Sequence, residues 1–123
     1  MIDWAQVNEL RVEMGEAFDE LVDAFLQETD EGMGRLDPGD ALPDQAAALH
    51  FLKGSALNLG FHSFARLCAE GEDAANRGQS PAFDPDALHD CYVQSRTEFL
   101  AGLARRAAGR GVRSGRQTAS RRR

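Results

Sequence analysis

Residues 49–60 read Leu49-His50-Phe51-Leu52-Lys53-Gly54-Ser55-Ala56-Leu57-Asn58-Leu59-Gly60, and this stretch decides the fold. Wound as an α-helix, it places four apolar residues at i, i+3, i+7 and i+10 on one face: Leu49, Leu52, Ala56 and Leu59. We predict that this face packs into a core. His50 falls near the opposite side of the helix, so we expect its imidazole to be solvated and available to react.

The outward side of this helix is predicted to be small and apolar, where an exposed helix usually carries charges. No Asp or Glu occurs between Gln45 and Ala69, although the chain has 20 acidic residues. Such a surface suits a partner that must come close, and it keeps carboxylates away from a phosphate. Besides Gly54, the residues that we predict to line the docking face are Ala46, Ala47, Leu57 and Phe61.

The run His50-x-x-Lys53-Gly54-Ser55-Ala56-x-x-Leu59-Gly60 resembles the signature of histidine-containing phosphotransfer (HPt) domains, the relay modules of multistep two-component signalling. Seven fixed residue types match in eleven positions, and the lengths of the flanking helices extend the resemblance over roughly residues 2 to 106. It implies that Nε2 of His50 relays a phosphoryl group between receiver-domain aspartates. The implied partners are response-regulator receiver domains or a hybrid histidine kinase.

Two neighbours of His50 fit this chemistry. Lys53, at i+3, can bring its ammonium near phosphoryl oxygens as a flexible point charge. Gly54, at i+4, leaves room beside the imidazole, although glycine in a helix costs about 1 kcal/mol relative to alanine. Tight packing of two helices is the other explanation for a glycine at this position.

The length of 123 residues provides one domain and no room for a nucleotide-binding domain beside it. The sequence has neither a Gly-rich phosphate loop nor a βαβ pattern. Any phosphoryl group must therefore arrive on another protein, and we expect no ATP site and no independent turnover. We predict no cofactor and no metal site of the chain's own; the resemblance implies that the partner receiver brings Mg²⁺.

The sequence begins without a basic n-region or an apolar h-region, and no segment approaches the 18 or so apolar residues of a membrane span. We therefore expect a cytoplasmic protein that does not bind membranes, and a bundle with its own core predicts a monomer.

Cys68 and Cys91 occupy apolar helical positions and are expected to be buried free thiols, with a disulfide as the alternative.

Periodicity and capping residues predict five helices, at residues 4–14, 16–36, 43–59, 63–77 and 85–108. The start signals are Asp3, Ser63 and Asp84, and Gly60 is the predicted C-cap of the central helix. By resemblance the first helix is a short lid at one end of the bundle, anchored by Trp4. The side chains that we expect to point inward from this helix are Trp4, Val7, Leu10 and Val12.

The predicted fold is all-α: an antiparallel four-helix bundle with a short N-terminal lid helix in residues 1–108, then a disordered Arg-rich tail in residues 109–123. Eight of the 14 basic residues and none of the acidic ones lie in residues 105–123. Six basic and 20 acidic residues remain elsewhere, a formal charge of −14. Nucleic-acid contact is one interpretation of the tail. Because the body is acidic and no recognition helix is present, we instead expect a solubilising or weakly steering segment.

One position departs from the family pattern. The fourth predicted helix reads Leu67-Cys68-Ala69-Glu70-Gly71-Glu72, where the resembled domains usually have Leu-Cys-x-x-Leu-Glu. Gly71 predicts that this helix is either less stable or more closely packed.

Two other histidines lack the Lys-Gly context of His50. His62 is predicted to be an exposed loop residue or a rim residue of the docking face, and His89 a surface residue.

A second function stays open: a binding module of the same fold that inhibits or scaffolds a receiver or kinase without being phosphorylated. A third, a hydrolase with His50 as general base, lacks a paired nucleophile and an orienting carboxylate in this stretch.

Overall fold

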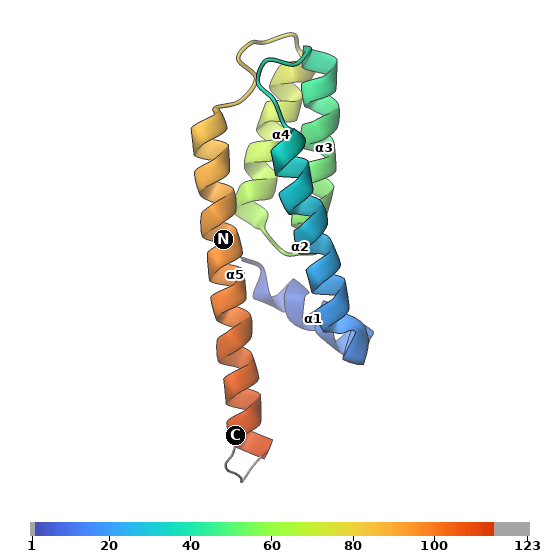
Figure 1. Ribbon diagram of the computed structural model, residues 1–123, viewed down its shortest axis with the longest axis vertical. Coiled ribbons are helices and arrows are strands. Elements are labelled where there is room, and N and C mark those ends of the chain that lie inside the picture. Colours follow the sequence, from blue (N-terminus) through green and yellow to red (C-terminus); the bar gives the residue numbers. More distant parts are fainter. Residues whose placement is uncertain (1, 115–123) are drawn as a thin grey trace.

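The structure, a computed structural model, describes residues 2–114, with side chains as far as residue 107. Its helices are α1 (Trp4–Met14), α2 (Phe18–Arg35), α3 (Leu42–Asn58), α4 (His62–Asn76) and α5 (Pro85–Ser114), with a 3-10 turn, Gly15–Ala17, between α1 and α2. The helices α2 to α5 form an antiparallel bundle, and α1 lies across its lower end (Figure 1). The predicted all-α fold with a short N-terminal helix is confirmed.

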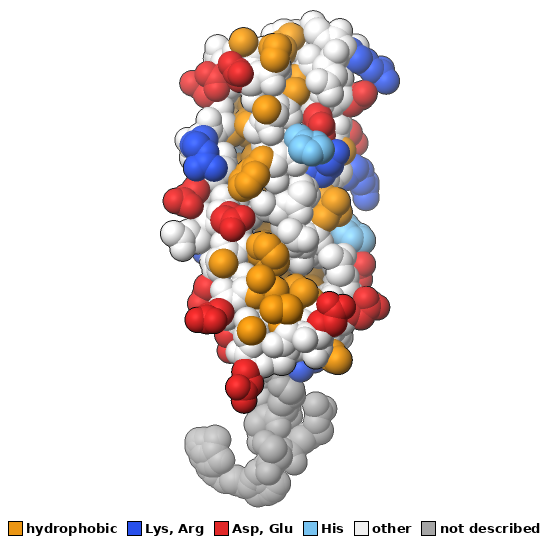
Figure 2. All heavy atoms as spheres, turned by 90° about the vertical axis from the view of Figure 1, so that its right-hand side faces the viewer, with side chains coloured by type: hydrophobic (Ala, Val, Ile, Leu, Met, Phe, Trp, Pro, Cys, Tyr) orange, Lys and Arg blue, Asp and Glu red, His pale blue; other side chains and the backbone are white. Residues whose placement is uncertain are grey.

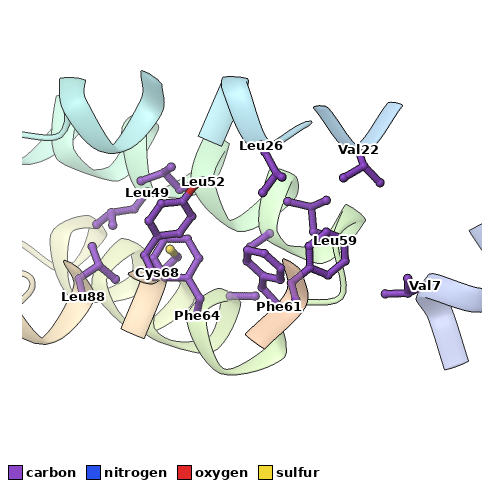
Figure 3. Close-up of a cluster of buried hydrophobic side chains, with 14 of the residues drawn as sticks. Val7, Val22, Leu26, Leu49, Leu52, Leu59, Phe61, Phe64, Cys68 and Leu88 are labelled. Atoms are coloured by element: carbon purple, nitrogen blue, oxygen red, sulfur yellow. The ribbon is translucent and has the colours of Figure 1, made fainter. Parts of the chain in front are cut away.

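The core is built on the predicted face of α3. Its four residues are at most 1% exposed: Leu49, Leu52, Ala56 and Leu59. Figure 3 shows the side chains from the other helices that pack against this face, among them Val22, Leu26, Phe64, Cys68 and Leu88. Because burying a leucine stabilises the fold by roughly 1.5–3 kcal/mol, this stripe fixes the rotation of α3 and so the direction in which His50 points.

Side-chain and glycine caps set several helix ends. The carboxylate of Asp3 accepts a backbone N–H at the start of α1. Asp84 accepts the N–H groups of Asp86 and Ala87 at the start of α5. Gly60 follows the end of α3 with a φ of +75°, a conformation that glycine adopts without strain. The starts of α1 and α5 agree with the prediction, whereas the C-cap of α3 is Leu59, one residue before the predicted Gly60.

The predicted cap at Ser63 is wrong. The helix α4 begins one residue earlier, at His62, and no side chain caps it. Phe61 holds the N-cap position with its ring fully buried, 5.3 Å between centroids from Phe99. The start of α4 is therefore held by the burial of the Phe61 ring and has no capping hydrogen bond from a side chain.

Trp4 anchors α1 to α5, as predicted for the lid. Its ring stacks on Phe99 with the centroids 5.8 Å apart, and the guanidinium carbon of Arg106 lies 3.7 Å from the ring centroid. Gly102 makes room for this contact, since a Cβ there would overlap the indole.

Val12, predicted to point inward, is 80% exposed. It follows buried Val7 by five residues, which turns it about 140° away from the core.

The helix α5 continues beyond its predicted end. It reaches Ser114, whereas the sequence pattern predicted a helix to residue 108 and a disordered tail after it. Extending an existing helix needs one hydrogen bond per added residue and no apolar period, so periodicity was a poor guide to this end. The rest of the predicted tail, residues 115–123, lies outside the described residues.

Within residues 2–114, none of the helices combines the length and the apolar character needed to cross a lipid bilayer.

Gly71 allows close packing between α3 and α4. The residue is buried, and a Cβ on it would lie 2.9 Å from Cδ1 of Leu49 and 3.3 Å from Cβ of Phe83. Of the two predicted alternatives, closer packing is the one observed.

Both cysteines are free thiols. Cys68 is buried in the core and Cys91 is partly exposed on α5. Burial raises the pKa of Cys68 to about 12. Its thiol is therefore protonated at neutral pH and packs as a small apolar side chain.

Candidate functional site

His50 lies in the middle of α3 and points to solvent. Its side chain is 68% exposed, whereas Leu49 and Leu52 are fully buried on the other side of the helix. The helical pattern predicted this orientation. The imidazole is thus carried by rigid backbone at the surface of the bundle.

Glu72 of α4 connects His50 with Lys53. Its Oε2 lies 2.9 Å from Nδ1 of His50, and its Oε1 accepts a hydrogen bond of 2.9 Å from Nζ of Lys53. The Glu72 side chain is 19% exposed. The close approach of α3 and α4 at Gly71 brings this carboxylate under the two side chains.

The charge on Glu72 determines which ring nitrogen of His50 carries the proton. The hydrogen bond from Lys53, and then the bond with His50, hold the pKa of Glu72 below its ordinary value of 4.5 despite some burial. At neutral pH the carboxylate is therefore ionised and only accepts hydrogen bonds. Nδ1 consequently donates its hydrogen to Glu72, and in the neutral ring Nε2 keeps its lone pair.

Glu72 is not among the residues predicted for the site, and the predicted surface free of carboxylates is wrong at this point. The carboxylate comes from 22 residues further along the chain, on the next helix and outside the acid-free run. A signal was present, because Glu72 is the final residue of the Leu-Cys-x-x-Leu-Glu pattern.

Gly54 lies one turn beyond His50 and is exposed. A Cβ at this position would meet nothing within 4 Å. Packing inside the described part of the chain therefore does not require a glycine here. Tight helix packing, one of the two explanations for Gly54, is therefore not observed, and the need to admit a partner stays a prediction.

The predicted docking face is only partly exposed. Ala47 is exposed, and Leu57 is 43% exposed. Ala46 is only 8% exposed, because it precedes Leu49 by three residues and shares the core face of α3. Phe61 is fully buried in the core, where the chain reverses between α3 and α4. Ala46 and Phe61 therefore cannot serve as docking residues in this structure.

Phe51 is an exposed aromatic residue that the prediction missed. It follows His50 on α3 and is 40% exposed. The guanidinium carbon of Arg35 lies 6.0 Å from its ring centroid. Gly32 of α2 lies beside the ring, since a Cβ there would be 3.1 Å from Cε2 of Phe51. In Figure 2, hydrophobic side chains run down the middle of this side of the molecule, and a histidine lies beside their upper part.

The structure brings neither of the other histidines into the network. His62 is exposed at the start of α4, with Nε2 3.4 Å from Oδ2 of Asp3. It belongs to a helix rather than to the predicted loop. His89 is exposed on α5, as predicted. Of the three histidines, all within the described residues, His50 is the one that shares a carboxylate with a lysine.

This arrangement suits a nucleophile that attacks a group with negative oxygens. A ring nitrogen with a lone pair is held in the exposed ring, a carboxylate fixes the opposite nitrogen, and an ammonium lies on the adjacent turn.

The family model described as Hpt domain matches residues 7–108 of the chain. No curated protein and no solved structure gives a significant match.

Proposed function

The chain belongs to the Hpt domain family, which takes part in histidine phosphotransfer within phosphorelays, and we propose that His50 is the residue that carries the phosphoryl group. The proposed donors and acceptors are aspartates of receiver domains, with a hybrid histidine kinase as a further partner. One observation carries this proposal: Glu72 holds Nδ1 of the exposed His50 and so leaves Nε2 as the nucleophile.

In the proposed transfer the lone pair of Nε2 attacks the phosphorus of a receiver's phosphoaspartate. A nitrogen–phosphorus bond forms, the phosphorus–oxygen bond to the aspartate breaks, and the aspartate leaves as a carboxylate. The imidazole ring becomes positively charged while its proton stays on Nδ1. The ionised Glu72 stabilises that charge in place, because it already accepts the Nδ1 hydrogen before the reaction.

Lys53 supplies the complementary positive charge. Its ammonium is bound to Glu72 in the free protein, and three donors on a flexible stem allow it to contact the phosphoryl oxygens as well. We propose that Lys53 turns toward the phosphoryl group when His50 is phosphorylated. The receiver would bring Mg²⁺ and its ligands, as phosphoryl transfer between these groups requires.

The exposed residues around His50 form the proposed docking face: Ala47, Phe51, Gly54 and Leu57. Phe51 is its largest apolar side chain, and exposed aromatic residues frequently become energetic centres of protein interfaces. Gly54 places no side chain next to the imidazole that would obstruct a partner. This face replaces the predicted one, from which Ala46 and Phe61 are removed.

The test is transfer from the organism's complete set of phosphorylated receiver domains, followed by intact mass and acid lability. We expect one acid-labile phosphoryl group on the wild-type protein and none on His50→Gln. The matched controls are His62→Gln and His89→Gln, which alter the other exposed histidines and should be labelled like the wild type.

Labelling of His50→Gln would contradict the proposal. Absence of labelling from every receiver would also contradict it. If one receiver then bound the protein and Phe51→Ala or Leu57→Ala abolished binding, the scaffold or inhibitor function would take its place.

A further inference from the structure

A pocket of about 250 Å³ opens between α4, α5 and the loop that joins these helices. Its apolar walls come from all three segments and include Leu67, Phe83 and Leu88. Leu88 is 2% exposed and belongs to the core cluster, at the same end of the core as Leu49 in Figure 3. The pocket therefore reaches from the surface to the core.

Gly71 forms part of the wall of this pocket. The residue lines the pocket and contributes no side chain to fill it. A Cβ on Gly71 would press against Leu49 and Phe83, at 2.9 Å and 3.3 Å. Leu49 and Phe83 therefore pack closely against Gly71 at this wall.

The rim of the pocket is acidic. Glu70 and Asp84 line it, both are exposed, and no Lys, Arg or His is among the described residues that line it. Asp84 is fixed in place, because its Oδ1 accepts the N–H groups of Asp86 at 3.0 Å and Ala87 at 3.2 Å. Two carboxylates beside an apolar space favour a ligand with an apolar body and a positive end.

We propose that this pocket binds a small organic cation, an aromatic ring with an ammonium group on a short chain. An apolar cavity of about 150 Å³ is enough for one benzene ring, so the space available here accommodates a ring with a short chain. The ring would lie against Leu67, Phe83 and Leu88, and the ammonium would face Glu70 and Asp84.

Such a ligand would lie beside the residue that precedes Glu72 on α4. Gly71, which lines the pocket, directly precedes Glu72 in the chain. The binding itself does not use His50, and its test is therefore independent of the proposed function.

The test is a methyl and amide NMR titration of the full chain with phenethylammonium. The matched probes are 2-phenylethanol, which is neutral, and 3-phenylpropionate, which is an anion. We expect saturable shifts at Leu67, Gly71 and Leu88 with phenethylammonium. We expect the neutral probe to bind roughly threefold more weakly, the ratio for one exposed ion pair, and the anion more weakly still.

Two variants separate the ring from the charge. Ala87→Leu adds a larger side chain at an exposed position that lines the pocket, and it should abolish the shifts. Ala101→Leu, at an exposed position of the same helix away from the pocket, should leave them unchanged. Glu70→Gln should weaken the cation and leave the neutral probe unaffected. Absence of saturable shifts, equal binding by Ala87→Leu, or an anion that binds as well as the cation would overturn the proposal.

Discussion

Glu72 holds two side chains of the site at once, one with each carboxylate oxygen. The spacing of His50, Lys53 and Gly54 follows from one helix, so a sequence pattern predicts their shared surface. The contact with Glu72 joins two helices across 22 residues. Helical periodicity contains no information about which residue of the next helix reaches across; the family pattern that ends at Glu72 marks this residue, and the structure shows its partners.

Replacement of the Glu72 carboxylate should allow the proton of neutral His50 to occupy either ring nitrogen. In Glu72→Gln the neutral amide can donate or accept a hydrogen bond, so the proton is no longer confined to Nδ1. We expect imidazole ¹⁵N shifts that indicate a mixture of tautomers, and phosphoryl transfer slower by about tenfold or more. Glu70→Gln, an exposed neighbour on α4, is the control. Unchanged ¹⁵N shifts in Glu72→Gln would show that Glu72 does not position the ring.

The network should weaken as the pH falls through the pKa of Glu72. That pKa is held below its ordinary value of 4.5, chiefly by the hydrogen bond from Lys53. The folded pKa lies below the unfolded one, so the stabilisation is present above about 4.5 and is lost as the pH falls through the folded value. A ¹³C-carboxyl titration should give a midpoint below 4.5 in the wild type and a higher midpoint in Lys53→Met. Equal midpoints would contradict the assigned cause.

Gly54 allows a test that separates folding from docking. Nothing inside the described structure occupies the space of a Cβ there, so Gly54→Ala should raise the free energy of unfolding by up to about 1 kcal/mol. Gly54→Glu should leave a folded protein, because its side chain enters solvent, yet block transfer by its bulk and charge beside His50. Urea unfolding and receiver-to-protein transfer measure the two effects. Unimpaired transfer by Gly54→Glu would contradict the need for close approach.

At the scale of the helices, local signals were sufficient where a cap or a clear stripe determines the element. The start of α1 after its N-cap Asp3 and the end of α3 just before Gly60 are of this kind. Tertiary packing decides the other cases. Phe61 is buried in the core, where its ring contacts those of Tyr92 and Phe99 on α5, and no local pattern identifies these distant partners.

The anchor of α1 on α5 should be sensitive to a single methyl group. A Cβ at Gly102 would overlap Trp4, whereas a Cβ at Gly34 of α2 would meet nothing within 4 Å. We expect Gly102→Ala to lower the free energy of unfolding by about 1–3 kcal/mol. We expect Gly34→Ala to raise it by roughly 0.5–1 kcal/mol. Urea denaturation of both variants is the measurement, and an equal response of the two would contradict the proposed fit of the indole against Gly102.

At the scale of the whole molecule, His50 lies exposed on one side of the bundle, and the packed helices enclose the core on the other sides. The long α5 covers the core opposite α3 and receives α1 at its lower part (Figure 1). A hydrogen-bonded cluster also joins α5 to α2, in which Tyr92 and Arg96 both donate to Asp30. In the proposed function the protein contributes a rigid nucleophile and a docking surface, and a partner supplies the rest of the chemistry.

The position of the phosphoryl group on the ring of His50 tests the central claim most directly. The measurement is a long-range ¹H–¹⁵N and ³¹P spectrum of ¹⁵N-histidine-labelled protein after phosphorylation by a receiver domain. We predict phosphorus coupled to Nε2 of His50, with Nδ1 still protonated toward Glu72. Phosphorus on Nδ1, or on a residue other than His50, would contradict the account.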